Sequence, residues 1–333
     1  MVLSRRPDAE RHPQEETTLA PFDQTVDVTH ATRRPVMRLV LLRLTHDLTA
    51  RIGLALVTAF LLAAAIGPWL APHDPREVTV DRLMGPSLDH LLGTDGLGRD
   101  LFSRLLHGAR LTLGTALLAA LLVSVIGLVV GMLSGYVGGV LDTALMRLVD
   151  VVLAIPGLVL ALAVAGLFSP SLLAVMLGLV TIWWAGYARV VRGLVLAVRA
   201  RPFVEAARSV GASEARILVR HVLPGVISPL IVLATLDIGQ LVLVISGLTF
   251  LGLGAPPPTP EWGAMLNDGR VYFLSDPHVV IIPGLAISLA VLGFNLLGDG
   301  IRDALDPRLI HAASGSRRRG LRHRPSRAPA AST

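Results

Sequence analysis

Charged residues are absent from four long stretches of the chain, which consist mostly of apolar residues. These uncharged blocks cover residues 52–71, 111–141, 151–188 and 277–298. An α-helix needs about 20 mostly apolar residues to cross the roughly 30 Å hydrocarbon layer of a membrane. The pattern therefore predicts an all-α polytopic membrane protein.

The uncharged blocks and their flanks predict six transmembrane helices. The block over residues 151–188 is too long for one helix, and the turn-forming sequence Ser169-Pro170-Ser171 divides it into two spans. The other spans are expected over residues 52–71, 111–137, 224–252 and 279–298. The expected organisation is a first helix over residues 52–71, an external segment over residues 72–110 and a five-helix core within residues 111–300.

The arginines indicate the orientation of these spans. If both termini are cytoplasmic, 24 of the 30 arginines lie in inner segments and six lie in outer segments. Short cytoplasmic loops of membrane proteins are enriched in basic residues. Both termini and the loop over residues 199–225 are therefore predicted to be cytoplasmic.

The two terminal regions carry signals of their own. Residues 1–51 are expected to form a cytoplasmic tail, and its last part, residues 36–48, an interfacial helix on the inner membrane surface. Residues 301–333 form a basic cytoplasmic tail, with disorder expected beyond residue 312 because Arg, Ala, Pro and Ser dominate it. Its arginines could contact anionic lipid. A solvated tail that only sets the topology is the alternative, and nucleic acid is not an expected partner.

Composition excludes several kinds of chemistry. The chain contains no cysteine and no lysine, which excludes disulfides, thiolate metal sites and the lysine of a phosphate-binding P-loop. The segment from Gly93 to Asp100 has the glycine spacing of a P-loop, but Arg99 replaces its lysine. All ten histidines lie outside the interiors of the predicted spans. We therefore expect no catalytic residue, no resident cofactor and no metal site.

One acidic residue falls near the middle of the fifth predicted span. A charge at that depth costs roughly 2.5–3.5 kcal/mol on insertion scales, so Asp237 is expected to face a cavity, the bundle interior or a partner. Gln240 shares its helical face and could bond to it. Two interpretations remain open, namely a residue of the transport path and a polar contact between helices or subunits.

The predicted cytoplasmic loop over residues 199–225 has the signals of two short helices. Pro202 suits the first turn of a helix, and Gly211 can adopt the left-handed conformation that ends it. Ser213 can cap a second helix, and Pro224 marks the start of the fifth span. Between these signals, an apolar face at helical spacing is formed by Phe203, Ala206, Ala207 and Val210.

This first helix presents small residues and the carboxylate of Glu205. Such a helix is suited to docking in the groove of a partner protein. An ordinary interfacial helix is the alternative, and local physics does not choose between them.

The loop resembles the EAA loop of bacterial ABC importer permeases. The resemblance rests on Glu205-Ala206-Ala207, on Gly211 and on Leu223-Pro224, whereas His221 stands where the family often has isoleucine. Residues 92–110, 250–270 and 294–308 are similar to the dipeptide, oligopeptide and nickel importer branch, in particular to its second, C-type permease subunit. The similarity covers about residues 39–309.

The resemblance implies a type I ABC importer permease fold in the bacterial inner membrane. It implies that the chain forms half of the path for peptides and pairs with a homologous B-type permease. Two cytoplasmic ATPase subunits would hold ATP and Mg, and an external solute-binding protein would deliver the substrate. Import of a nickel chelate or another small solute is one alternative. An ion-coupled secondary transporter is an alternative of a different class.

The resemblance also suggests which residues make contacts. The expected ATPase contact consists of Phe203, Glu205, Ala206, Ala207, Gly211 and Pro224. The candidates for contact with the binding protein or the partner permease are Asp95, Arg99, Asp100, Glu261 and Trp262. A purely structural role in the external loops is the alternative for these last five residues.

Overall fold

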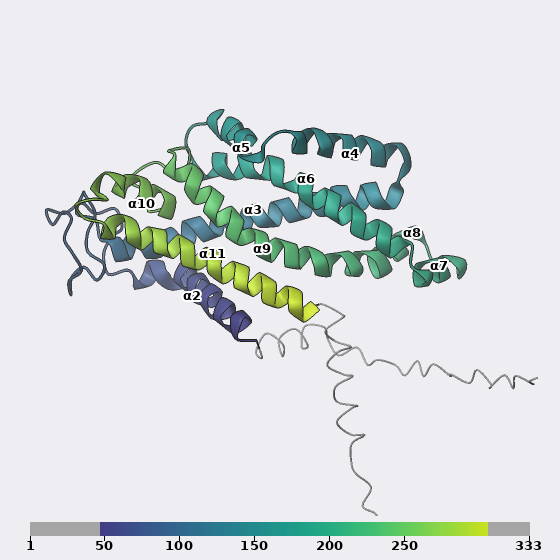
Figure 1. Cartoon of the computed structure of the whole chain (residues 1–333), viewed down its shortest axis with the longest axis horizontal. Coiled ribbons are helices and arrows are strands. Elements are labelled where there is room, and N and C mark those ends of the chain that lie inside the picture. Colours follow the sequence, from purple (N-terminus) through teal and green to yellow (C-terminus); the bar gives the residue numbers. More distant parts are fainter. Residues whose placement is uncertain (1–46, 306–333) are drawn as a thin grey trace, which may run out of the picture.

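The structure of the chain is a computed structural model that describes residues 47–305. Over that range it is a bundle of α-helices without a β-strand (Figure 1). Five helices are long and apolar enough to cross a membrane, and a bent helix pair can form a sixth span. The predicted all-α polytopic fold is therefore confirmed. The predicted interfacial helix and most of the basic tail lie outside the described residues.

The five long helices form the body of the bundle. They are α2 (Leu48–Leu70), α3 (Leu101–Val137), α6 (Leu172–Arg199), α9 (Leu223–Phe250) and α11 (His278–Leu305). The short elements are α4 (Gly139–Ala154), α5 (Gly157–Gly166), α7 (Pro202–Ser209), α8 (Glu214–Ile217), η1 (Leu218–Val222), α10 (Trp262–Gly269) and η2 (Arg270–Tyr272).

Several helices extend past the uncharged blocks. Helix α3 begins at Leu101 rather than at residue 111, because the carboxylate of Asp100 caps it by accepting from the Ser103 N–H at 2.7 Å. Charged residues are tolerated in a helix that continues beyond the hydrocarbon layer. Counting uncharged residues therefore gives the membrane-embedded part of a helix and not its ends.

The third predicted span is not one continuous helix. Helices α4 and α5 are bent by 87° relative to each other at Ile155 and Pro156. Proline has no backbone N–H to donate, and it disfavours the helical conformation in the residue before it, which is extended here. The predicted third span, from residue 151 to the turn at residues 169–171, therefore corresponds to a bent helix pair that begins earlier, at Gly139.

Helices α3 and α6 cross with their backbones in close contact. Gly127, Gly131 and Gly135 form a stripe with four-residue spacing on α3. A Cβ atom added to Gly127 would lie 2.3 Å from the Cβ of Tyr187, and one added to Gly131 would lie 2.6 Å from the Ala188 carbonyl oxygen. Small residues at a membrane helix crossing allow this approach. The core of the bundle is thus organised around α6.

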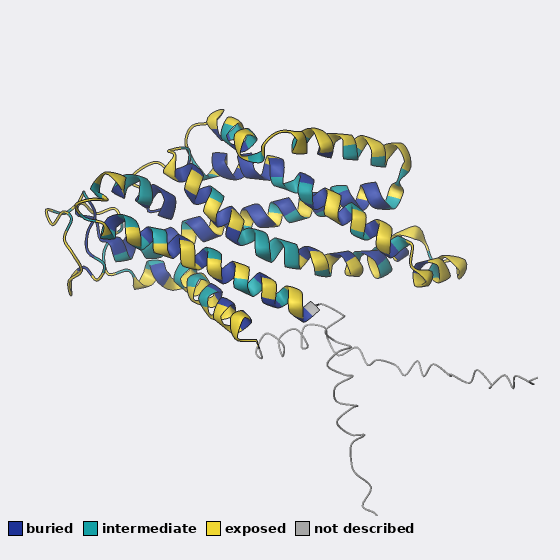
Figure 2. Cartoon of the chain, viewed as in Figure 1, coloured by how far each residue is buried: buried dark blue, intermediate teal, exposed yellow. Residues whose placement is uncertain are grey.

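The outer faces of the bundle are apolar. Exposed large side chains include Leu62 on α2 (53% exposed), Leu121 on α3 (58%) and Leu285 on α11 (55%). Figure 2 shows buried residues mainly where α3, α6 and α9 face one another, and exposed ones on the outer surfaces. These faces suit contact with lipid or with another membrane subunit.

The loops gather at two opposite ends of the bundle (Figure 1). Helices α7 and α8 lie at one end, which the arginine distribution assigns to the cytoplasm. The segment between α2 and α3 lies at the other end together with α10. The two regions singled out by the sequence are therefore far apart.

Candidate functional site

Helix α7 is delimited by its flanking residues. Pro202 occupies its first turn, and Gly211 follows its end with φ +80°. The N–H of Gly211 donates to the Arg208 carbonyl at 3.0 Å, and that of Ala212 to the Ala207 carbonyl at 3.1 Å. A Cβ atom at residue 211 would meet nothing within 4 Å. Glycine is thus favoured here by its backbone conformation and not by packing.

A buried valine packs α7 against the bundle. Val204 is fully buried, whereas Phe203 is 47% and Val210 84% exposed. The predicted apolar face centred on Phe203 therefore points mainly outward, with Ala206 exposed and Ala207 half-buried. This arrangement leaves apolar surface uncovered on α7.

Glu205 lies on the exposed surface of α7. Within residues 47–305 its carboxylate has neither a hydrogen bond nor an ion pair. An exposed, unpaired carboxylate beside exposed apolar side chains is suited to contact with another protein. We name the exposed residues Phe203, Glu205, Ala206, Val210 and Gly211 the α7 surface.

The second short helix of the loop is continuous with the fifth span. Ser213 caps α8, with 3.4 Å between its hydroxyl and the Arg216 N–H. Helix α8 then passes through one π-helical turn, η1, into α9, which gives a single helix over residues 214–250. Pro224 is exposed in the first turn of α9 and does not separate two helices. Pro224 thus lies inside the long helix.

Polar contacts connect this end of the bundle. The hydroxyl of Tyr136, near the end of α3, donates to the carboxylate of Glu214 and lies 3.0 Å from the Glu214 carbonyl oxygen. The Arg199 guanidinium, at the end of α6, donates to the Tyr136 carbonyl at 2.8 Å. The start of α8 is therefore tied to α3, and α3 is tied to α6.

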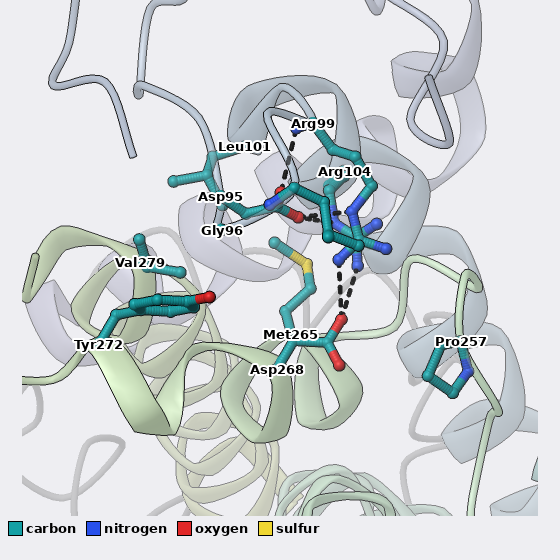
Figure 3. A pocket seen from close by; sticks show the side chains of 11 residues that line it. Asp95, Gly96, Arg99, Leu101, Arg104, Pro257, Met265, Asp268, Tyr272 and Val279 are labelled. Atoms are coloured by element: carbon teal, nitrogen blue, oxygen red, sulfur yellow. Dashed lines mark hydrogen bonds and ion pairs between the residues drawn. The ribbon is translucent and has the colours of Figure 1, made fainter. Parts of the chain in front are cut away.

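At the opposite end, a buried network of charges joins the external segment to α10 (Figure 3). Arg99 Nε lies 2.6 Å from an Asp95 carboxylate oxygen, and Arg99 Nη2 lies 2.9 Å from an Asp268 carboxylate oxygen. Arg104 lies 3.5 Å from each of the same two carboxylates. A cavity of about 250 Å³ adjoins the network. Arg104 and Asp268 were not predicted.

The other predicted external residues are also engaged within the chain. Glu261 caps α10 by accepting from the Ala264 N–H at 2.9 Å, and it accepts from the Thr112 hydroxyl at 2.8 Å. Burial raises the pKa of Glu261, although these hydrogen bonds oppose the shift. Trp262 donates from its indole nitrogen to the Leu105 carbonyl at 3.0 Å.

These contacts change the interpretation of the external candidates. Each of the five is at most 3% exposed: Asp95, Arg99, Asp100, Glu261 and Trp262. A buried side chain with its polar atoms satisfied cannot reach a partner without local unfolding. The placement favours the alternative of a structural role in holding the external loops together.

The acidic residue of the fifth span lines a cavity. Asp237 is half-buried and borders a cavity of about 360 Å³ together with Tyr187 and Trp183 of α6 and Gly157 of α5. Gln240 is exposed, and no hydrogen bond joins it to Asp237 in the described part of the chain. The suggested bond between the two is therefore not formed.

Comparison with known protein families identifies the chain. Residues 127–311, more than half of the chain, match the family described as binding-protein-dependent transport system inner membrane component. The chain belongs to this family. Residues 36–86 match a second family, the N-terminal TM domain of oligopeptide transport permease C. The two matches together make this chain an ABC importer permease of the C type, located in the inner membrane.

Relatives of this permease align with it over most of their length. The chain is 48% identical over 255 residues to the glutathione transport system permease protein GsiD of Shigella flexneri serotype 5b (strain 8401). It is 46% identical over 255 residues to the protein of the same name from Escherichia coli O6:K15:H31 (strain 536 / UPEC). In both cases the alignment covers 76% of this chain and 84% of the relative.

Proposed function

We propose that this permease forms half of the membrane path of an ATP-driven importer for peptides. The observation that carries the proposal is the pair of family matches, one of which is to an oligopeptide permease domain. The relatives are named for glutathione, a tripeptide, so glutathione is the first substrate to test. Neither the two family matches nor the glutathione-named relatives point to nickel.

The family match and the exposed helix faces indicate the partners of this permease. It belongs to a family of binding-protein-dependent inner membrane components, so an external solute-binding protein delivers the substrate. The uncovered apolar sides of α2, α3 and α11 leave room for a homologous B-type permease as the other half of the path. Two cytoplasmic ATPase subunits bind ATP and Mg, and this chain contributes no ATPase site.

The α7 surface is the ATPase contact in this proposal. Three features support it: the position of α7 at the predicted cytoplasmic end, the exposure of Phe203 and Val210, and the unpaired carboxylate of Glu205. Short connections join α7 to α6 on one side and to the α8–α9 helix on the other. A push on α7 is therefore passed directly to two membrane helices.

Energy transfer then needs no chemistry within the membrane. ATP-driven closure of the ATPase pair changes the position of α7, and the ends of α6 and α9 follow. The ATPase pair can shift the permease between two states only through contacts that differ between those states. The α7 surface supplies these contacts.

The test compares variants of the assembled importer. Glu205→Ala removes the carboxylate, and Gly211→Pro removes both the left-handed conformation and the N–H that donates to Arg208. Each variant is expected to lower co-purification of the ATPase subunits or the uptake per ATP hydrolysed. A loss of about 1.4 kcal/mol of binding free energy would weaken ATPase binding about tenfold. Membrane insertion should remain normal.

The matched control is Leu88→Ala. Leu88 is 97% exposed in the external segment, at the opposite end of the molecule. This variant should bind the ATPases and couple hydrolysis to uptake like the wild type. Normal ATPase binding and coupling in both α7 variants would refute the assignment of the contact.

A further inference from the structure

Two histidines and an aspartate that are distant in the sequence converge in the external segment. His73 follows α2, His90 lies in the middle of the segment, and Asp100 caps α3. One potential ligand atom from each residue lies within 4.8 Å of the others. Nothing in the permease function derived above uses the imidazoles of this cluster.

The distances in the cluster suit a common metal ion. His90 Nδ1 lies 3.0 Å from one oxygen of Asp100, and His73 Nδ1 lies 3.9 Å from the other. Two ligands bound tetrahedrally to Zn²⁺ at 2.0–2.1 Å are separated by about 3.3 Å. Small side-chain rotations would bring all three donors to that separation. The centroids of the two imidazole rings lie 4.8 Å apart, and the ring planes are tilted by 35° relative to each other.

The Nδ1 atom of His73 gives a second, independent reason to expect a ligand at the cluster. This atom is buried, and within residues 47–305 it has no hydrogen-bond partner. A buried polar atom without a partner is unfavourable, and a metal ion would satisfy it. The backbone N–H of His73 donates to the Ser103 hydroxyl at 3.1 Å, which holds the residue in place.

The cluster has a preformed support and a way in. The Ser103 N–H donates to Asp100, and the His90 N–H donates to the Ser87 hydroxyl at 3.0 Å, so two ligands are oriented by neighbouring groups. His73 also lines an open groove of about 750 Å³. Asp74, Arg76 and Arg110 line the same groove, so its charges are mixed.

We propose that His73, His90 and Asp100 form a binding site for a borderline divalent cation, with Zn²⁺ as the representative ion. Two imidazoles and one carboxylate suit zinc, whereas Mg²⁺ and Ca²⁺ prefer oxygen ligands only. The bound ion takes the place of the direct contact between His90 and Asp100. It joins the end of α2, the external segment and the start of α3, and so it stabilises the external face of the permease.

The experiment measures zinc binding to the full-length chain together with its partner permease in lipid nanodiscs, without an affinity tag. After treatment with EDTA, the sample is dialysed against Zn²⁺, and bound zinc and amide hydrogen exchange are measured. The wild type should bind one more zinc ion per chain than His73→Ala. Zinc should slow exchange over residues 73–100 in the wild type and not in the variant.

Two controls make the result specific. His107→Ala alters another histidine of the same groove, whose Nδ1 instead lies 2.9 Å from the Ser103 carbonyl oxygen, and it should bind zinc like the wild type. Mg²⁺ at the same concentration should leave exchange unchanged.

The proposal is overturned if His73→Ala binds as much zinc as the wild type, or if zinc does not slow exchange over residues 73–100. An equal effect of Mg²⁺, or equal loss of zinc in His107→Ala, also overturns it. The exchange measurement on the wild type alone keeps the test decisive should His73→Ala fold poorly.

Discussion

Arg208, in the last turn of α7, forms an ion pair with Glu214, the first residue of α8. The Nε of Arg208 lies 3.0 Å from a Glu214 carboxylate oxygen. The pair bridges the turn that contains Gly211, and Glu214 in turn contacts Tyr136 of α3. The orientation of α7 is therefore tied to α3 through one carboxylate, in addition to its chain connections to α6 and α9.

We expect this pair to affect coupling more than stability. Both side chains are about half exposed, and exposed ion pairs contribute only about 0.2–1 kcal/mol. Arg208→Ala and Glu214→Ala should leave the melting temperature nearly unchanged and reduce the uptake per ATP hydrolysed. The double variant should be no worse than the more severe single variant, because both remove the same connection. Additive losses would show that the two residues act separately.

We expect a single methyl group added at the crossing of α3 and α6 to lower the stability of the protein. In Gly131→Ala the new Cβ atom would lie 2.6 Å from the Ala188 carbonyl oxygen, so the two backbones must separate. Overpacking of this kind costs about 1–3 kcal/mol. Gly114→Ala is the control on the same helix, because a Cβ there meets nothing within 4 Å. Thermal unfolding in detergent should show a lower melting temperature for the first variant only.

Local patterns in the sequence account for much of this structure. The apolar blocks mark the membrane helices, and the position of Gly211 marks the end of α7, because each depends on residues close in the chain. The bend at Pro156 is marked in the sequence by the proline alone, because the uncharged block over residues 151–188 shows no other interruption before Ser169.

Contacts over long sequence separations account for what could not be predicted. The Arg99–Asp268 pair joins residues 169 positions apart, and no local spacing indicates it. The external candidates were chosen from motif similarity, which does not distinguish a buried structural residue from an exposed contact. For the same reason, the spacing of the histidines in the sequence does not indicate that folding brings His73 and His90 together.

The buried charge network should be essential for the external face. Arg99→Ala leaves the buried Asp95 with one longer ion pair, to Arg104 at 3.5 Å, besides the backbone N–H groups of residues 97 and 99 from which it accepts. Removing one partner of a buried ion pair costs about 3–5 kcal/mol, and the remaining arginine places the expected loss at the lower end. Arg82→Ala, an exposed arginine of the same segment, is the control. Limited proteolysis should cleave residues 72–100 faster in Arg99→Ala. Equal protease resistance in the two variants would contradict the structural role of the network.

The cavity beside Asp237 helps to distinguish a residue of the transport path from a polar contact between helices or subunits. A transport role requires the carboxylate to face the path, whereas a structural role requires it to hold helices together. Asp237 lines a cavity of about 360 Å³, and no arginine pairs with it in the described part of the chain. We therefore expect Asp237→Asn to keep the melting temperature and subunit assembly while changing the peptide uptake rate by tenfold or more. Gln240→Ala, an exposed polar residue one turn away, should leave uptake unchanged. A lower melting temperature or loss of the partner permease in Asp237→Asn, with normal uptake by the remaining complex, would show that the residue is a structural contact.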